Sequence, residues 1–341
     1  MDVSVLDALS PECTAFVQQA PQAKLCHVPE WTTMVERAFG HSGYYLVARE
    51  KEQICGVLPV VQVRSRLFGN RLVSQPFSDY GGPLVTQPAA LEALYRRAVE
   101  IAAQCRCESV EFRNVEPLPY ELHMRTDKIS MCLALAPDPQ EVWKGLRHKT
   151  RNRVSKAQRE GLVVTSGGQE LLDEFYQVWT VRMHELGTPC YPRKLFSSIM
   201  ETFPDLARIF LAKLNGTTTA VLFAYTFKGW VQCSWGAALR DYDGMGPNYI
   251  LNWGAIEYYC GQGMKWFDFG RSTVGSSQHT FKERWGASPI DLHWQYWTPP
   301  GQQLRLASPD DARYRRKVEM WKKLPLWASR VIGPAISPAL P

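Results

Sequence analysis

Apolar positions in the first half of the chain repeat with two different periods. Segments rich in β-branched and aromatic residues predict strands, and a run after Pro88 with apolar residues every three to four positions predicts a helix. The strands are expected at 44–49, 54–63 and 109–112, and the helix at 89–105. Residues 75–83 are dense in Gly and Pro, which predicts a loop of the kind that often carries functional residues.

The second half shows the same mixture of periods. From Pro139 to Glu160 one apolar stripe recurs at the helical period, so we predict a single helix that ends at Gly161. Further strands are expected at 162–165, 209–214, 219–227, 231–236 and 265–269, and further helices at 170–185 and 248–260. Adjacent strands followed by a helix that begins near Gly, and then by another strand, favour an α+β core over an alternating βαβ nucleotide-binding fold.

The chain of 341 residues is long enough for two domains, each with its own core. Hydrophobic residues make up 45% and charged residues 21%, which excludes wholesale disorder. We therefore predict an α+β protein with two mixed sheets flanked by helices. The expected parts are an N-terminal domain at 1–137, a basic connecting helix at 138–161, a C-terminal domain at 162–300 and a basic aromatic tail at 301–341.

The nine cysteines form no C-x-x-C pair, and the N-terminus lacks the basic and apolar regions of a secretory signal. Both features predict a cytoplasmic protein with reduced thiols. Cys105 and Cys107 have no matching Cys or His pair at ligand spacing, so no metal site is expected. No run of about 18 apolar residues is present, so we expect any membrane contact to be peripheral.

From Lys144 to Arg159 the chain carries seven cations and no acid, and its formal net charge is +6. On a helix these cations divide into two rows that flank the apolar stripe. The row with Lys149, Arg153 and Lys156 is suited to hold a phosphate or carboxylate while the stripe stays buried. The alternative is an ordinary solvated face.

A second candidate for anion binding is the glycine-containing segment 241–249, which precedes a predicted helix. Glycines let backbone amides approach a ligand, and a helix N-terminus favours a negative group near Asn248 and Tyr249. A tight turn that only leads into the helix is the alternative.

A third candidate is the predicted strand that ends in Gly270-Arg271 and is followed by Lys282 and Trp285. Its end presents a fixed cation at the rim of the sheet, and Lys282 adds positive charge. Such a rim suits an anionic or carbonyl-bearing substrate. The alternative is that Asp268 pairs with one of these cations in a structural role.

The tail interleaves basic and aromatic residues between 314 and 330. That mixture suits an anionic membrane surface, and we expect peripheral contact with the inner face of the cytoplasmic membrane. A helix docked on its own protein, with its charges in water, is the alternative. The Pro-containing end at 334–341 is expected to fray.

Taken together, these segments resemble the FemAB-like branch of the GNAT-fold acyltransferases, with the best match to the FemAB proteins associated with exosortase and PEP-CTERM systems. The segments that carry the resemblance are 146–157, Gly161-Leu162, 246–249, 268–272, Phe281-Lys282 and Trp285-Gly286. The resemblance covers nearly the whole chain apart from the tail, and it implies two tandem GNAT-like domains. It also implies direct attack of an amine on an ester or thioester carbonyl, with no covalent enzyme intermediate and no permanently bound cofactor.

The resemblance implies one of two acyl donors. Peptidyltransferase members of the family take an aminoacyl group from tRNA, whereas other members of the superfamily use acyl-CoA. Asp241 stands where the GNAT pyrophosphate loop usually begins with Gln or Arg, which disfavours ordinary CoA binding. The sequence also has no long heptad pattern to build the helical arm that several cell-wall members insert.

The leading hypothesis is therefore an acyl- or aminoacyltransferase that forms an amide on an anionic sugar-, peptide- or lipid-linked precursor in cell-envelope or exopolysaccharide biosynthesis. We expect the acceptor to lie between the domains. The expected substrate-binding residues are Lys149, Arg153, Asn248, Tyr249, Arg271, Lys282 and Trp285. Asp79 and Tyr80 are the candidates for removing the amine proton, although a loop carboxylate such as Asp79 often only caps a turn.

Two other functions fit the same residues. One is an acyl-CoA-dependent N-acetyltransferase that acts on a nucleotide sugar. The other is a non-catalytic GNAT-fold scaffold at the membrane surface, which the departure at Asp241 and the basic tail favour.

Overall fold

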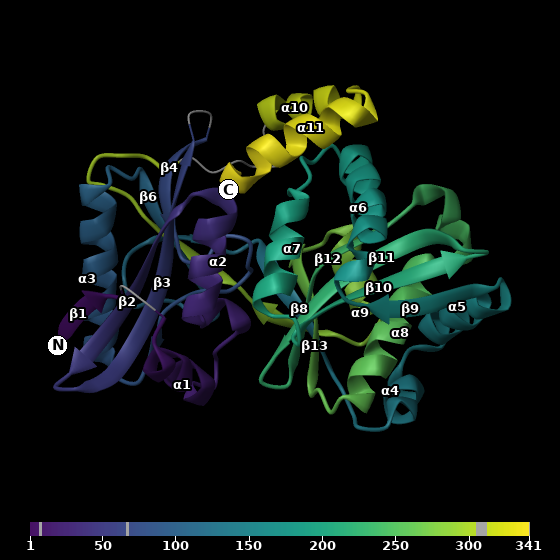
Figure 1. Ribbon diagram of the computed structural model, residues 1–341, viewed down its shortest axis with the longest axis horizontal. Helices are drawn as coiled ribbons and strands as arrows, with labels where there is room; N and C mark the ends of the chain where they lie inside the picture. The colour runs from purple at the N-terminus through teal and green to yellow at the C-terminus, as the bar shows by residue number, and fades with distance from the viewer. Residues whose placement is uncertain (7–8, 66–67, 305–311, 341) are drawn as a thin grey trace. The chain divides into compact units, whose positions relative to one another are not determined.

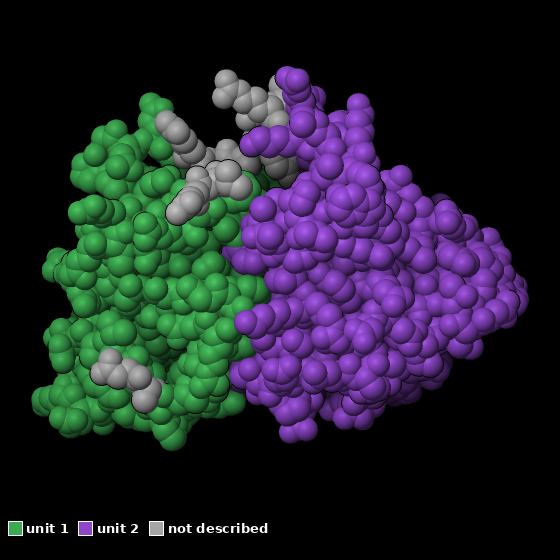
Figure 2. Space-filling view, turned by 45° about the horizontal axis from the view of Figure 1, so that its top comes forward, with its two compact units in different colours: residues 1–128, 291–306, 339–341 green, residues 129–290, 307–338 purple. Residues whose placement is uncertain are grey.

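The computed structural model describes residues 1–6, 9–65, 68–304 and 312–340. The chain forms two compact units, coloured green and purple in Figure 2. The first unit contains residues 1–128, 291–306 and 339–341, and the second contains residues 129–290 and 307–338. Each unit is built on one mixed sheet with helices on its faces (Figure 1).

The first unit holds a sheet in the order β1-β2-β3-β4-β6-β15-β7, with β5 paired to β3. Its strands are β1 (Asp2–Val5), β2 (Ser42–Glu50), β3 (Gln53–Ser65), β4 (Gly69–Val73), β5 (Leu84–Val85), β6 (Ser109–Asn114), β7 (His123–Arg125) and β15 (His293–Trp297). Its helices are α1 (Pro11–Gln19), η1 (Leu25–His27), α2 (Pro29–Phe39) and α3 (Pro88–Gln104). The β4–β6 pair is parallel, whereas β15 pairs antiparallel with β6.

Alternation along β2 divides the first unit into two layers of packing. Leu46 and Ala48 join the core cluster that α3 covers with Leu94 and Ala98. Tyr45 points to the opposite face, where its hydroxyl donates to the His27 carbonyl oxygen at 2.7 Å. The strand period of two therefore places α3 on one face of the sheet and η1 with α2 on the other.

The second unit holds a sheet in the order β14-β8-β13-β12-β11-β10-β9. Its strands are β8 (Lys128–Ala134), β9 (Leu162–Gly167), β10 (Ala207–Leu214), β11 (Thr217–Phe227), β12 (Trp230–Ala238), β13 (Trp266–Thr273) and β14 (Ser288–Asp291). Its helices are α4 (Pro139–Gly145), α5 (His148–Arg159), η2 (Gln169–Leu171), α6 (Leu172–Leu186), α7 (Arg193–Thr202), η3 (Arg240–Met245), α8 (Pro247–Gly261), α9 (Ser277–Glu283), α10 (Ala312–Lys322) and α11 (Leu326–Ile336), followed by η4 (Ser337–Ala339).

Two helical layers cover the second sheet. Leu222 and Ala224 of β11 belong to the core cluster shared with α8, whereas Phe223 between them packs against Phe175 of α6 and Phe196 of α7. One face is thus closed by α8, with α5 packed against it, and the other by α6 and α7 (Figure 1). Strand β11 therefore carries buried apolar side chains on both faces, as a sheet between two layers of helices requires.

The regular elements expected from the sequence are confirmed with shifts of a few residues at their ends, except in one segment. The single helix expected from Pro139 to Glu160 is two helices, α4 and α5, because the backbone is extended at Leu146 and Arg147. Gly145 weakens a helix at this point. The break lets Val142, Leu146 and Val154 all reach the same core cluster.

The compact units differ from the domains expected at 1–137 and 162–300. The basic segment 138–161 lies within the second unit, and β15 adds to the first sheet although it follows the second in sequence. Strand pairing is decided by long-range hydrogen bonds that no local pattern encodes. Strand β8, which sequence periodicity missed, likewise belongs to the second sheet.

The C-terminal end is helical, so the expectation that residues 334–341 fray is wrong for the described part. Helix α11 continues to Ile336, with Pro334 inside it, and Ser337 is buried with its hydroxyl donating to the Cys190 carbonyl oxygen at 2.9 Å. Residues 305–311 of the predicted tail lie outside the described residues. Across the described ranges, every helix is too short or too polar to reach from one side of a bilayer to the other.

All nine cysteines lie among the described residues, and each is a free thiol. Eight of them are buried, and burial raises the pKa of the Cys26 and Cys107 thiols to about 12. These thiols are therefore packing residues with little thiolate character.

Candidate functional site

Strands β12 and β13 lie side by side and then stop pairing in the middle of the second sheet. Their parallel register runs from Trp230–Trp266 to Gln232–Asp268, although both fully described strands continue beyond it. The register between β11 and β12 shifts at the same level, which marks a β-bulge in β12. Backbone groups past this point do not pair between β12 and β13, so they need other partners.

Gly270 lies where β12 and β13 separate, and the backbone there takes a conformation that favours glycine. Its φ of +75° lies in the left-handed region that favours glycine, and a Cβ there would stand 3.1 Å from the Cys233 carbonyl oxygen. Two buried polar atoms nearby on the same strands, Gln232 Oε1 and Ser272 Oγ, have no hydrogen-bond partner among the described residues. Buried polar atoms of this kind call for a water or a ligand.

Asp268 fixes the backbone at this position. The side chain is 1% exposed, and its Oδ1 accepts hydrogen bonds from Ser130 Oγ at 2.5 Å and from the Gly270 amide at 2.8 Å. Ser130 comes from β8, which the sequence periodicity had not revealed as a strand. These contacts hold the turn of the chain at Gly270 in one conformation.

Lys282 also holds the turn at Gly270 through hydrogen bonds. Its ammonium group is buried and donates to the carbonyl oxygens of Gly270 at 2.7 Å and Arg271 at 3.0 Å. Helix α9, which carries it, begins with Ser276 accepting from the His279 amide. Arg271 itself is exposed at the end of β13. Lys282 therefore positions the strand end, whereas Arg271 is accessible to an anion.

An aromatic cluster joins the start of α8 to α9. Tyr249 lies 5.3 Å from Phe281 and 6.1 Å from Trp285 between ring centroids, and Trp285 also contacts Phe269 of β13. Trp285 is fully buried, so it supports the site from within the core. Tyr249 is half-buried and stands at the edge of this cluster.

The basic helix α5 packs on the N-terminal end of α8. Lys156 Nζ donates to the Gly244 carbonyl oxygen at 2.8 Å, and a Cβ at Gly246 would lie 3.6 Å from the Arg153 carbonyl oxygen. Lys149 and Arg153 share the flank of α5 that carries Lys156, and both are exposed. That cationic flank therefore faces the loop that leads into α8.

The loop before α8 also carries two acids. Asp241 and Asp243 are exposed in η3, and Gly246 ends this turn with φ at +80° before Pro247 opens the helix. Asn248, predicted to bind an anion, is half-buried, and its carbonyl oxygen accepts from Asn252 Nδ2 at 2.7 Å. Two carboxylates at a helix N-terminus oppose a phosphate there by like-charge repulsion.

A second polar centre lies in the first unit, around Arg113 of β6. This guanidinium is buried, pairs with Glu111 Oε1 at 2.7 Å, stacks on the Trp294 ring and donates to the Ser78 carbonyl oxygen. Burial by itself would lower the pKa of Arg113, but the Glu111 carboxylate raises it above its ordinary value. The sequence signal for this pair is two opposite charges spaced two residues apart in one strand. We did not predict the pair from that spacing.

The loop expected at 75–83 is confirmed, and Arg113 holds it in place. Gln75 and Phe77 take left-handed conformations with φ of 60° and 65°, which non-glycine residues adopt at a cost. Asp79 is fixed through its carbonyl oxygen, which accepts from Trp294 Nε1 at 3.1 Å. Such a strained and tightly held loop is typical of functional sites.

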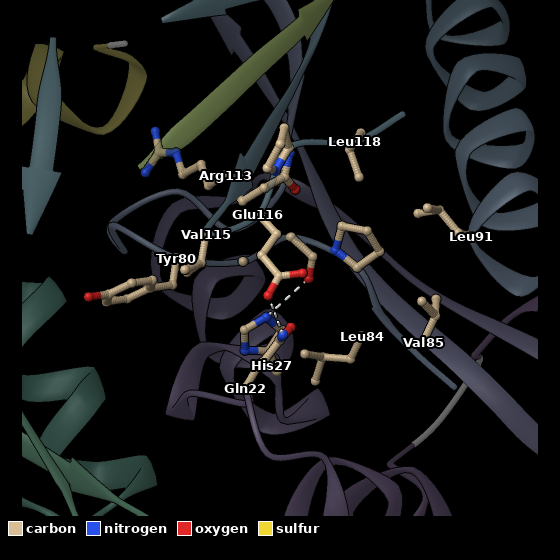
Figure 3. A pocket seen from close by; sticks show the side chains of 15 residues that line it. Gln22, His27, Tyr80, Leu84, Val85, Leu91, Arg113, Val115, Glu116 and Leu118 are labelled. Carbon is tan, nitrogen blue, oxygen red and sulfur yellow. Dashed lines mark hydrogen bonds between the residues drawn. The ribbon is translucent and has the colours of Figure 1, made fainter. Parts of the chain in front are cut away.

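A pocket of about 230 Å³ opens beside this loop (Figure 3). Gln22 Nε2 donates to Glu116 Oε1 across it at 3.2 Å. Tyr80 borders the pocket but is only 2% exposed, and its hydroxyl points away from the other labelled side chains (Figure 3). The pocket is therefore lined by mixed polar and apolar groups, with Asn114 Oδ1 buried and lacking a hydrogen-bond partner among the described residues.

His27 at the pocket wall makes stability depend on pH. Burial lowers the pKa of His27 to about 4, and the neutral ring accepts from the Lys24 amide at 3.0 Å and donates to the Gly82 carbonyl oxygen at 3.1 Å. Below its ordinary pKa of 6.5 the unfolded chain binds a proton that the folded protein rejects. We expect a loss of about 2 kcal/mol between pH 7 and pH 5.

Urea unfolding at both pH values, with His27→Gln as the comparison, measures this effect. The variant lacks the titrating ring, so its stability should fall less over the same interval. An identical pH dependence in the two proteins would contradict the assignment.

The structure brings the predicted binding residues together in part. Six of them come from α5, α8 and α9 and from the segment just after α9, which contact one another, and the seventh, Arg271, lies at the end of β13 where Lys282 clamps it. Asp79 and Tyr80 lie in the first unit. Across the described residues, no group of three His, Cys, Asp or Glu side chains is arranged to hold a metal ion.

Comparisons with known proteins agree with this geometry. Residues 144–283, which include α5, β12, α8 and β13, match the model of the acetyltransferase (GNAT) domain. No curated protein matches the chain in sequence.

Solved structures extend the likeness to both units. FemX superposes with a TM-score of 0.67 at 13% identity, covering 88% of this chain and 98% of FemX. A tandem GNAT protein from the clavulanic acid biosynthesis pathway gives 0.53 at 13%, covering 87% and 98%. The C-terminal domain assigned to a lysylphosphatidylglycerol synthetase from Agrobacterium fabrum gives 0.56 at 11%, covering 84% and 91%. The expected α+β fold with two GNAT-like sheets is thus confirmed.

Proposed function

We propose that this GNAT-fold protein transfers an acyl or aminoacyl group to an amine of an anionic sugar-, peptide- or lipid-linked precursor, forming an amide. The observation that carries the proposal is the cationic flank of α5, with Lys149 and Arg153 exposed, packed beside α8 and the parted strands β12 and β13. We assign these cations and Arg271 to the anionic groups of the substrates. The proposed setting is cell-envelope or exopolysaccharide biosynthesis.

The reaction needs no cofactor bound to the protein. The lone pair of the amine attacks the donor carbonyl, the C–N bond forms, and the carbonyl carbon releases the tRNA hydroxyl or the CoA thiol after the amine loses its proton. The Gly270 amide already donates to Asp268, so we assign stabilisation of the oxyanion to the other backbone amides past the Gln232–Asp268 pair, where β12 and β13 no longer bond to each other. Lys282 and Asp268 hold that backbone in place.

The favoured donor is an aminoacyl-tRNA. Asp241 and Asp243 beside the N-terminus of α8 oppose a CoA pyrophosphate, whereas the row of exposed cations on α5 suits the repeated phosphates of a nucleic acid. Among proteins of similar fold, one is assigned as a lysylphosphatidylglycerol synthetase and another is a tandem GNAT protein studied without AcCoA.

Thermal unfolding with each donor distinguishes the two. A saturating ligand at 100 times its Kd stabilises the folded protein by about 2.7 kcal/mol, so the true donor should raise Tm by a few degrees. We expect charged tRNA to do so and acetyl-CoA not to, and we expect mass spectrometry to find a ribonuclease-sensitive aminoacyl product. A rise with acetyl-CoA and an acetylated amine would establish the N-acetyltransferase instead, and no response to either would favour a scaffold.

Asp79 and Tyr80 remain our candidates for accepting the amine proton. The rigid loop around Arg113 gives Asp79 a fixed backbone, which a general base requires. In the same assay, Asp79→Asn should keep the donor-induced rise in Tm and lose about 100-fold in rate. Unchanged turnover in this variant would remove Asp79 from the mechanism.

A further inference from the structure

Helices α10 and α11 are docked on α6. The Leu324 carbonyl oxygen accepts from His184 Nε2 at 2.8 Å, and Arg330 Nε donates to Thr180 Oγ1 at 3.0 Å. Gly333 packs so closely on Cys190 that a Cβ would come within 3.1 Å of its sulfur. The pair of helices, drawn in yellow near α6 in Figure 1, is therefore a fixed part of the second unit.

Several large apolar side chains of these helices are exposed to water. Trp327 is 72% exposed and Val331, one turn later on the same face, is 66% exposed, with Ile332 beside them at 41%. Met320 of α10 is 61% exposed. Single exposed apolar residues are ordinary, but four on two consecutive short helices mark a surface that binds something apolar.

Positive charge accompanies this apolar surface. The exposed cations on the described side chains of α10 and the turn after it are Arg315, Arg316, Lys317, Lys322 and Lys323. Glu319 is the one acid among the described side chains from 315 to 338, and it pairs with Lys322 at 2.9 Å. Arg330 adds a sixth exposed cation on α11.

We propose that Met320, Trp327, Val331 and Ile332, with the cations around them, seat the protein on the surface of an anionic phospholipid bilayer. The apolar side chains enter the boundary between headgroups and acyl chains, and the cations pair with lipid phosphates. A nucleic acid would use the cations but leave the apolar residues in water. A second copy of this chain would bring two such sets of cations together, so electrostatic complementarity favours the lipid.

Cosedimentation of the full chain with vesicles tests the proposal. We expect binding to vesicles of phosphatidylglycerol with phosphatidylcholine, and at least 10-fold weaker binding to phosphatidylcholine alone. Trp327→Ser with Val331→Ser should weaken binding at least 10-fold, and Arg316→Ala, Lys317→Ala and Lys323→Ala together should weaken it about 100-fold. All five side chains are exposed, so Tm should stay unchanged.

A matched control comes from exposed valines elsewhere in the second unit. Val163 is 57% exposed on β9 and Val274 is 53% exposed after β13, so Val163→Ser with Val274→Ser removes exposed apolar side chains away from α10 and α11. This control should bind vesicles as the unaltered protein does. Full binding by the Trp327 and Val331 variant, equal binding to neutral vesicles, or binding of RNA in place of vesicles would each overturn the proposal. None of these measurements depends on transferase activity.

Discussion

Replacing Arg113 by Met should lower the free energy of unfolding by about 3–5 kcal/mol. The guanidinium is buried against Glu111, so its removal leaves an unpaired buried carboxylate. It also removes the donor that holds the Ser78 carbonyl oxygen in the loop 75–83. Urea unfolding at pH 7 measures the change, and the double variant Glu111→Gln with Arg113→Met should recover part of the loss because no buried charge is then stranded.

An exposed arginine provides the matched control for this prediction. Arg96 pairs with Glu92 on the solvent side of α3, and such surface pairs contribute about 0–1 kcal/mol. Arg96→Met should therefore leave stability nearly unchanged. A loss below about 1 kcal/mol in Arg113→Met would show that the pair does not organise the loop.

Replacing Lys149 and Arg153 together by Ala should reduce kcat/KM about 100-fold. Each exposed cation that pairs with a substrate phosphate or carboxylate contributes about 1.5 kcal/mol, the low end of the range for charged hydrogen bonds, and the two side chains lie on the flank of α5 that faces the loop before α8. The loss should appear mainly in KM, because these cations bind the substrate in its ground state as well as in the transition state. Steady-state kinetics with the donor that raises Tm measures the change in kcat/KM.

Other cations of the same helix make the control. Arg151 and Arg159 lie in the other row of α5, so Arg151→Ala with Arg159→Ala removes the same charge away from the proposed site. This pair should change kcat/KM by less than about 5-fold. Equal losses in both double variants would mean that α5 acts only through its overall charge, and no loss in either would exclude α5 from substrate binding.

Local patterns in the sequence predicted most of the elements. The β-branched runs around residues 50–53 predicted β2 and β3, and the apolar stripe with its flanking cations predicted a basic helix. The stripe did not reveal the break at Leu146 and Arg147, because both short helices keep the same apolar period across it. It predicted the burial of Val154 but not the division into α4 and α5.

The fine roles of the candidate residues depended on contacts between distant segments. Lys282 was expected to bind substrate from its charge alone, whereas in the structure its ammonium is held by the carbonyl oxygens of Gly270 and Arg271. The tail was expected to offer its interleaved basic and aromatic residues between 314 and 330 to a membrane, and in the structure Trp327 is exposed whereas Trp321 is half-buried. A local pattern gives the spacing of such side chains, but docking on α6 decides which face meets water.

The sequence by itself determined the α+β composition, the cationic row on α5 and the loop 75–83, because periodicity, charge spacing and Gly-Pro content act within one segment. Only the tertiary structure decided that β12 and β13 part beyond Gln232 and Asp268, that β15 crosses into the first sheet, and that Arg113 organises the loop. These features rest on hydrogen bonds and ion pairs between residues remote in the chain. Their energies depend on burial and on partner geometry, which arise only when the sheets assemble.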